Sequence, residues 1–260
     1  MSDPYFLHYE DRAAITDSNR VPLVLIHAFP VGPEMWNDVV ELLSGRNLVV
    51  DLPGFGNTPV PDGAPNLDDA ADALAATLDR AGIDKAVIAG LSLGGYVALA
   101  FLERHADRVA GLGLLDTQLD ADSEEKRAQR AQTVDSVRNI GTKALSISEL
   151  LGETTHKTQP LVVANAEQLA REAHPDGVVW ALEAMASRPG RAYVVREAGV
   201  PVLLLAGSED TMTPISVLEE PLAEIDDVAA VTVEQAGHLS AMEQPNEVAE
   251  ALDELVGRAN

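Results

Sequence analysis

The chain has 260 residues, 46% of them hydrophobic, which suits one α/β domain with room for a sizeable insertion. The absence of cysteine excludes disulfides, thiolate metal sites and cysteine nucleophiles. The formal net charge of −24, spread along the chain, argues against nucleic acid or an anionic membrane as a partner and is typical of a solvated acidic surface.

The beginning of the chain predicts an edge hairpin and no targeting segment. Tyr5 to Glu10 and Ala13 to Thr16 resemble two short strands joined by a turn at Asp11-Arg12. The first residues lack the basic and apolar regions of a signal peptide, so we expect a cytoplasmic protein. The longest uncharged run, Ala86 to Leu102, is interrupted by glycines and fits a strand, a turn and a helix better than a membrane span.

Apolar strands alternate with helical patterns on both sides of the middle of the chain. The predicted strands are Leu23 to Ile26, Asn47 to Val50, Lys85 to Ala89, Val109 to Leu115, Val200 to Ala206 and Val228 to Val233. The predicted helices are Glu34 to Leu43, Leu67 to Ala81, Gly95 to Arg104, Ile215 to Ile225 and Pro245 to Arg258. Asn66 is placed to cap the second of these helices, and Gly82 is placed to end it.

Residues 119–191 interrupt this alternation. They contain no strand-like apolar run, and their amphipathic stretches are Glu124 to Ile140, Ala144 to Leu151, Leu161 to Ala173 and Asp176 to Ser187. We interpret residues 119–191 as a helical cap inserted into a core that residues 1–118 and 192–260 form.

The alternation predicts a fold of the α/β class. With the hairpin included, we expect a mostly parallel eight-stranded sheet with helices on both faces. Ligand-binding groups gather at the carboxyl ends of the strands in such sheets. The residues that carry chemistry should therefore follow the predicted strands.

Gly90-Leu-Ser-Leu-Gly94 matches the pattern Gly-x-Ser-x-Gly, which places a nucleophilic serine on a strained turn between a strand and a helix. A predicted strand precedes it and a predicted helix follows it, as this geometry requires. The free N–H groups of the helix would face the negative charge that develops beside Ser92 during acyl transfer. Ser92 is therefore the candidate nucleophile.

A serine hydroxyl needs a base within hydrogen-bond reach, and a carboxylate must orient that base. His238 follows the last predicted strand, and Gly237 allows its loop to bend back over the sheet. Asp210 follows the preceding strand and gives the chain order Ser, Asp, His that this geometry favours. Its neighbour Glu209 is a carboxylate that could be confused with it. Asp116 is a second candidate for the orienting carboxylate, and its alternative is a structural role at the start of the insertion.

The oxyanion hole of such a site needs two N–H donors, one from the residue after the nucleophile and one from the loop after an earlier strand. Leu93 supplies the first donor, and Phe29 in the loop His27-Ala-Phe-Pro30 supplies the second. His27 is then expected to brace this loop rather than to act as a base.

Five ordered motifs resemble the α/β-hydrolase superfamily, and the resemblance covers essentially the whole chain. They are His27-Ala-Phe-Pro30, Asp51-Leu-Pro-Gly-Phe-Gly56, Gly90-Leu-Ser-Leu-Gly-Gly95, Gly207-Ser-Glu-Asp210 and Gly237-His238. The segment from Leu115 to Arg127 is similar to the cap entrance of enol-lactonase-like esterases and cofactor-free haloperoxidases. Ala28 departs from the glycine that is usual in the superfamily.

This resemblance implies a serine hydrolase that cleaves a small carboxylic ester or lactone through an acyl-enzyme on Ser92, with no metal or organic cofactor. A C–C bond hydrolase or a perhydrolase would use the same triad. A slow-turnover ligand-binding receptor of the same fold is an alternative of another class.

Four side chains are candidates for substrate contact, namely Phe29, Trp36, Leu91 and Trp180. Phe29, Trp36 and Leu91 lie near the predicted oxyanion loop or the serine, and Trp180 lies in the predicted cap. Mostly apolar candidates favour a small and fairly hydrophobic acyl group. The sequence leaves open the natural substrate and whether the chain forms homo-oligomers.

Overall fold

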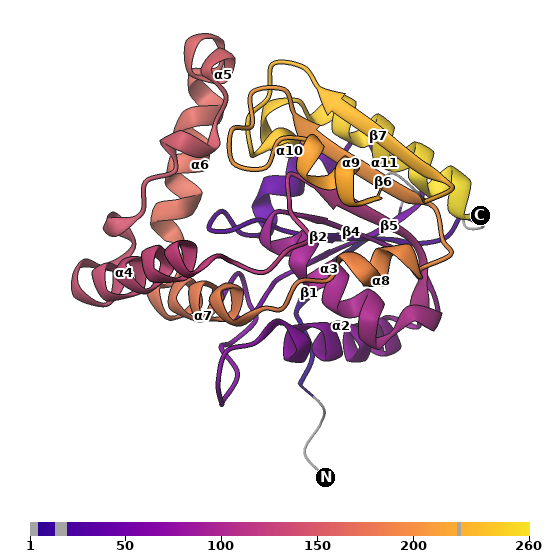
Figure 1. The fold of residues 1–260 in the computed structure, drawn as a ribbon, viewed down its shortest axis with the longest axis horizontal. Helices are drawn as coiled ribbons and strands as arrows, with labels where there is room; N and C mark the ends of the chain where they lie inside the picture. Colours follow the sequence, from indigo (N-terminus) through magenta and orange to yellow (C-terminus); the bar gives the residue numbers. More distant parts are fainter. Residues whose placement is uncertain (1–4, 14–19, 223–224) are drawn as a thin grey trace.

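A sheet of seven strands forms the centre of the computed structural model, which describes residues 5–13, 20–222 and 225–260 (Figure 1). The strand order is β1-β3-β2-β4-β5-β6-β7. The edge strand β1 (Tyr9–Ala13) is antiparallel to β3 (Arg46–Val50), and all other neighbours are parallel. The other strands are β2 (Leu23–Ile26), β4 (Ala86–Leu91), β5 (Val109–Leu115), β6 (Val202–Gly207) and β7 (Val228–Val233).

The sheet separates two hydrophobic cores. Side chains alternate between the faces of a strand, so Val24 and Ile26 of β2 belong to one core and Leu23 and Leu25 to the other. The central strands β2, β4, β5 and β6 are buried at every position. This double burial explains why their sequences are continuously apolar rather than alternating.

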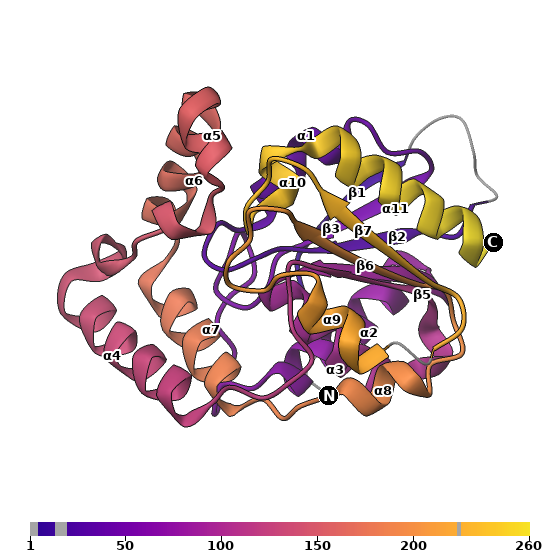
Figure 2. The same cartoon turned by 45° about the horizontal axis from the view of Figure 1, so that its top comes forward.

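Helices cover both faces (Figures 1 and 2). One face carries α2 (Leu67–Ala81), α3 (Leu93–Arg104), α8 (Ala192–Arg196) and α9 (Ser216–Leu222), and the other carries α1 (Asn37–Val40), α10 (Ser240–Glu243) and α11 (Pro245–Ala259). No helix of the described ranges combines the length and the apolar character that crossing a bilayer would take.

The limits of α2 agree with the prediction from sequence. The Asn66 side chain accepts a hydrogen bond from the N–H of Asp69 at 2.8 Å. Gly82 ends the helix in the left-handed conformation with φ 66°. Both end residues act through local geometry, which is why the sequence alone locates them.

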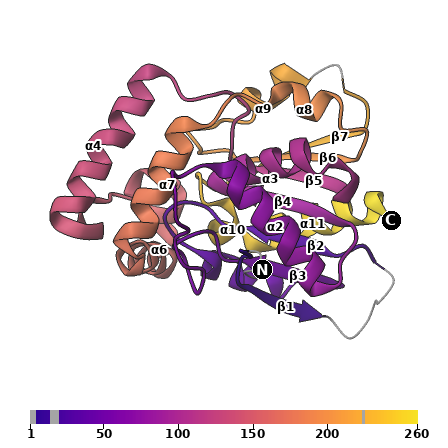
Figure 3. The same ribbon diagram turned by 90° about the horizontal axis from the view of Figure 1, so that it is seen from below.

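Residues 119–191, which we call the insertion, connect β5 to β6 and lie beside one end of the sheet (Figures 1 and 3). They form α4 (Glu124–Ile140), α5 (Glu153–Thr158), α6 (Pro160–Glu172) and α7 (Pro175–Ser187). The helix expected at 144–151 is wrong. Two 3₁₀ turns, η3 (Gly141–Ala144) and η4 (Ser148–Leu150), occupy this region because Leu145 between them is extended, with φ −83° and ψ 131°.

The expected N-terminal hairpin is also corrected. Asp11 and Arg12 do not form a turn, because they continue β1 and pair with Leu48 and Asn47 of β3. The second expected strand ends at Thr16, which lies outside the described residues. The described sheet therefore has seven strands instead of eight.

The helix expected at 34–43 is shorter and less regular than predicted. Pro33–Trp36 form a 3₁₀ turn, η1, and α1 ends at Val40. The end of this segment is held to the core by Val39, Val40 and Leu43, which are buried in the same hydrophobic cluster as the apolar residues of α11.

The insertion meets the core backbone to backbone at Gly177. A Cβ atom on Gly177 of α7 would overlap the carbonyl group of Gly54, which lies in the loop after β3. Gly177 is buried and helical, so its lack of a side chain serves this close approach. The contact fixes the distance between α7 and the loop.

Gly177→Ala is therefore expected to destabilise the protein by about 1–3 kcal/mol, the usual cost of overpacking. Gly257→Ala is the matched control, because Gly257 is an exposed helical residue with open space at its Cβ position. The control should be neutral or stabilising by up to about 1 kcal/mol. Urea unfolding of both variants measures this, and equal effects of the two substitutions would contradict the contact.

Candidate active site

Ser92 lies on a sharp turn between β4 and α3, with φ 54° and ψ −110°. Positive φ is costly for a residue with a side chain, so the surroundings must hold this turn in place. Cβ atoms on Gly90 or Gly94 would overlap the backbone of Gly94 and of Ile26, respectively. The glycines therefore allow the strand, the turn and the helix to pack closely, and Ser92 projects at the carboxyl end of β4.

His238 connects Ser92 to Asp210 in one row of hydrogen bonds. Its Nε2 lies 2.8 Å from Ser92 Oγ, and its Nδ1 lies 2.8 Å from Asp210 Oδ2. The side chains of His238 and Asp210 are 4% and 0% exposed. The structure thus brings together the three residues that the sequence analysis selected.

Asp210 is held by the turn that follows it. Its Oδ1 accepts hydrogen bonds from the N–H groups of Met212 at 2.8 Å and Thr213 at 3.1 Å. The Thr213 hydroxyl donates to Oδ2 at 2.7 Å. These bonds leave Oδ2 directed at the imidazole, and sequence reasoning did not identify Thr213.

The pKa values of His238 and Asp210 shift in opposite directions. Burial lowers the pKa of His238, but the hydrogen bond and the charge of Asp210 outweigh burial and raise it above its ordinary value. Burial raises the pKa of Asp210, but the bonds from His238 and Thr213 outweigh burial and lower it. The pair therefore favours an ionised Asp210, which fixes a proton on Nδ1 and leaves Nε2 of the neutral imidazole free to accept one.

Asp116, the second candidate for the acid, forms no hydrogen bond with His238, whose Nδ1 contacts Asp210 instead. Its carboxyl group accepts hydrogen bonds from the N–H of Gly207 at 2.8 Å and from the hydroxyl of Ser240. Complete burial raises the pKa of Asp116 to about 8. It is therefore protonated at neutral pH and joins the ends of β5 and β6 to α10.

His27 braces the loop after β2. Its Nδ1 donates to the carbonyl of Ala28 at 3.0 Å, and its Nε2 accepts from the N–H of Leu52 at 3.1 Å. Burial lowers the pKa of His27 to about 4, so the ring is neutral. The Ala28 carbonyl and the Phe29 N–H belong to one peptide group, so this bond also fixes the direction of the Phe29 N–H.

The N–H groups of Phe29 and Leu93 donate no hydrogen bond to any protein group in the part of the chain that the structure describes. Leu93 is the first residue of α3, where an N–H group has no partner within the helix. Both groups are available to a ligand atom beside Ser92.

A cavity of about 250 Å³ opens at Ser92 and His238. The core residues that line it are Phe29, Pro30, Tyr96, Gln118, Met212 and Thr213. The insertion residues that line it are Lys126, Arg130, Leu145, Ser146, Leu150 and Met185. Phe29 is the one candidate for substrate contact among these lining residues.

The positions of Trp36, Leu91 and Trp180 do not agree with the substrate contact expected for them. All three are at most 3% exposed, and none lines the cavity at Ser92. Trp36 and Leu91 belong to the core on the α11 side of the sheet, and Trp180 belongs to the core on the α3 side. They are packing residues, as large apolar side chains at helical or strand spacing commonly are.

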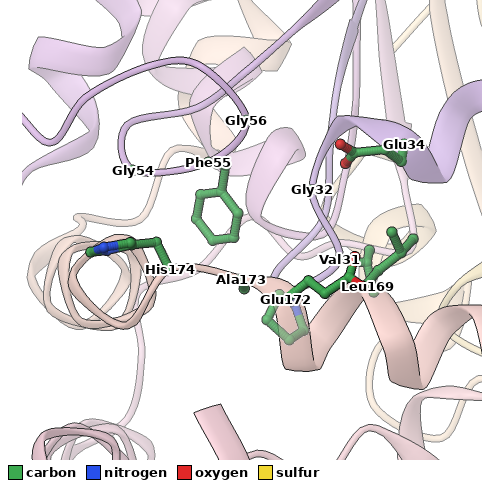
Figure 4. Close-up of a pocket in the computed structure, with 11 residues that line it drawn as sticks. Val31, Gly32, Glu34, Gly54, Phe55, Gly56, Leu169, Glu172, Ala173 and His174 are labelled. Atoms are coloured by element: carbon green, nitrogen blue, oxygen red, sulfur yellow. The ribbon is translucent and has the colours of Figure 1, made fainter. Parts of the chain in front are cut away.

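A second cavity, of about 390 Å³, shares Pro30 with the first. The loop at 54–56 and the end of α6 face each other across it, and the Phe55 ring points between them (Figure 4). Its lining contains no serine, threonine or lysine. The candidate nucleophile Ser92 and its partner His238 line the first cavity and not the second.

Glu243 is a buried carboxylate that the sequence analysis missed. Its side chain accepts hydrogen bonds from the N–H groups of Gly237 at 3.0 Å and Leu239 at 3.2 Å, on either side of His238. It also accepts from the N–H of Gly152 at 2.8 Å and the hydroxyl of Thr155 at 2.6 Å. One carboxylate thus joins the histidine loop to the insertion.

Two further bonds support this junction. The N–H of His238 donates to the carbonyl of Leu150 at 2.8 Å, and Glu209 accepts from the N–H of Thr154 at 2.8 Å. The signal in the sequence is an acidic residue, Glu243, on the apolar start of a helical segment. Its partners at 152 and 155 cannot be read from that pattern.

Comparisons with known proteins agree with this geometry. The profile described as "Alpha/beta hydrolase family" matches residues 23–251. A pimeloyl-[acyl-carrier protein] methyl ester esterase of Aromatoleum aromaticum is 28% identical over 254 residues, which cover 92% of this chain and 99% of the relative.

Two solved structures are similar over nearly their whole length. A thermophilic esterase from Thermogutta terrifontis, described as malate bound, has a TM-score of 0.90 and 34% identity, and the match covers 97% of this chain and 93% of that one. The enol-lactonase from Burkholderia xenovorans LB400 has a TM-score of 0.83 and 24% identity, with 96% of each chain covered. The second likeness is one of fold alone.

Glu243→Gln is expected to lower the free energy of unfolding by about 2–4 kcal/mol. Each carboxylate oxygen of Glu243 accepts hydrogen bonds from two buried donors, and in the variant an amide nitrogen, which cannot accept them, takes the place of one oxygen. It should also lower the pKa of His238, since the charge of Glu243 helps to raise that pKa. Urea unfolding and an NMR titration of His238 measure the two effects. The control Glu247→Gln, at an exposed position of α11, should change neither, and identical behaviour of both variants would contradict the junction.

Proposed function

The chain belongs to the alpha/beta hydrolase family and is an ester hydrolase, and on this basis we propose that it cleaves a small carboxylic ester or lactone through an acyl-enzyme on Ser92. The sequence motifs predicted membership of this superfamily, and the family match over residues 23–251 confirms that prediction. The observation that carries the proposed mechanism is the row Ser92, His238 and Asp210, with 2.8 Å at each of its two links.

In the first step, Ser92 Oγ attacks the carbonyl carbon while its proton passes to Nε2 of His238. The new C–O bond forms as the carbonyl π pair moves onto oxygen. Asp210 keeps the proton on Nδ1 and stabilises the imidazolium that results. The 2.8 Å distance between Nε2 and Oγ supports direct transfer of the proton.

The negative oxygen of the tetrahedral intermediate needs preorganised donors. In this proposal, the N–H groups of Phe29 and Leu93 bind it. Support comes from their lack of protein acceptors in the described chain, from the fixed orientation of the Ala28–Phe29 peptide and from the place of Leu93 at the start of α3. The methyl group of Ala28 is buried and leaves this orientation intact.

The intermediate collapses when the C–O bond to the leaving alcohol breaks and His238 returns its proton to that oxygen. Water then attacks the acyl-enzyme with His238 as the base, and the same donors hold the second oxyanion. The acid is released and Ser92 regains its proton. No step requires a group from outside the chain other than water.

The alternatives share this triad. A C–C bond hydrolase or a perhydrolase would need the same nucleophile, and a ligand-binding receptor would need the cavity alone. The names of the relatives favour ester hydrolysis, and the complete hydrogen-bonded row favours turnover over binding alone.

The nucleophile is tested by labelling with a fluorophosphonate probe. Wild type should form an adduct on the peptide that carries Ser92, and Ser92→Ala should form none and lose about 10⁴–10⁶-fold in kcat on p-nitrophenyl acetate. Ser146→Ala is the matched control, because Ser146 lines the same cavity. An adduct that persists in Ser92→Ala would place the nucleophile elsewhere.

Asp210→Asn should lower kcat by about 10³–10⁴-fold, since it removes the partner that fixes the imidazole tautomer. In wild type, His238 must be neutral to act as a base, so kcat/KM falls as pH drops through a pKa above the ordinary value of about 6.5. The variant loses the effect that raises this pKa and keeps the burial that lowers it, so its acid limb should move to lower pH. Loss of activity in Asp116→Asn but not in Asp210→Asn would assign the acid to Asp116.

A further inference from the structure

The lining of the cavity at Ser92 differs in charge from the rest of the protein. The chain carries a net charge of −24, yet this lining contains Lys126 and Arg130 and no aspartate or glutamate. An acidic protein disfavours anions over most of its surface. The two cations that line the cavity at Ser92 are therefore a local exception to the negative charge of the chain.

Lys126 and Arg130 lie one helical turn apart on α4, at i and i+4, so their side chains share one face of the helix. Like charges at this spacing destabilise a helix. Lys126 forms no ion pair with a carboxylate of any described residue, and its side chain is only partly exposed. No carboxylate of the described chain therefore pairs directly with Lys126.

Arg130 is fixed in place by one side of its guanidinium. Its Nε donates to Asp122 Oδ2 at 2.5 Å, and Arg188 Nη1 donates to Asp122 Oδ1 at 2.7 Å. Asp122 has a side chain with 0% exposure, so it is shared between two arginines and is closed to the cavity. Arg130 Nη1 donates no hydrogen bond to the described residues and is available to a ligand.

Two carboxyl groups near Ser92 and His238, those of Asp210 and Asp116, do not line the cavity. Asp210 has a side chain with 0% exposure and lies behind His238, whose Nδ1 it contacts. Asp116 is fully buried, and its raised pKa of about 8 keeps it neutral. The accessible charges of the lining are therefore positive.

Resting on the ester hydrolysis proposed above, we propose that the enzyme selects esters that carry a carboxylate at the end remote from the ester group, which Lys126 and Arg130 bind. The ester group is processed by Ser92 and His238 on the core, and the carboxylate reaches the insertion. The cavity of about 250 Å³ holds a chain of a few carbons between the two ends. The lining fits a carboxylate in either the acyl or the alcohol part of the ester.

Two matched substrate pairs test this selection. Monomethyl glutarate is compared with methyl 5-methylhexanoate, in which an isopropyl group replaces the carboxylate of the acyl part. The acetate ester of 4-hydroxybutyrate is compared with 4-methylpentyl acetate, in which the same replacement is made in the alcohol part. In at least one pair, kcat/KM for the anionic ester should be about tenfold or more above that for its neutral partner, the size expected for a charged hydrogen bond.

Lys126→Met should reduce this ratio about tenfold, and Lys126→Arg should preserve most of it. Arg127→Met removes the same charge from an exposed position on α4 outside the cavity, so the ratio should stay as in wild type. Preference for the neutral ester in both pairs, or a ratio unchanged in Lys126→Met, would overturn the proposal. Fluorophosphonate labelling of Ser92 in the same samples separates that outcome from failure of the hydrolase assignment, in which neither ester is cleaved and no adduct forms.

Discussion

The site depends on the hydrogen bond between His238 and Asp210, because it holds Nδ1 of the imidazole away from Ser92 and leaves Nε2 facing the serine. The two residues follow different strands of the sheet, and a third strand delivers the serine. Parallel strands end at one edge, so the sheet places all three without any of them being close in sequence. The carboxylate must stay ionised inside the protein for this to work, and the donors of the 212–213 turn supply that stabilisation.

Local patterns predicted the parts of the structure that local geometry controls. The cap at Asn66, the end of α2 at Gly82, the turn at Ser92 and the central strands follow from short stretches of sequence, and the structure has each of them. The hydrogen-bonded row of Ser92, His238 and Asp210 was predictable because chain order and strand ends restrict the choice to a few residues. The structure confirms that Asp210, rather than Glu209 or Asp116, is the carboxylate that contacts His238.

The predictions are wrong where contacts between residues far apart in the sequence determine the local structure or the exposure of a side chain. Trp36 and Trp180 look like pocket residues in sequence, but tertiary contacts cover both completely or nearly so. The N-terminal strand continues through Asp11 because pairing with β3 outweighs the preference of Asp-Arg for a turn. Glu243 escaped notice for the same reason, since its four donors come from segments about 90 residues apart or from the loop beside it.

The junction at Glu243 divides the insertion into two parts with different tolerances to change. Residues 150–155 and the backbone on both sides of His238 are joined by shared hydrogen bonds, so a movement that lifts residues 150–155 from the core also releases the loop that holds His238. By contrast, α4 lines the cavity through Lys126 and Arg130 and takes no part in that network. A substitution on α4 can therefore change the lining of the cavity while the hydrogen bonds around His238 stay in place. A substitution at Glu243, by contrast, alters the support of the His238 loop even when Ser92, His238 and Asp210 are unchanged.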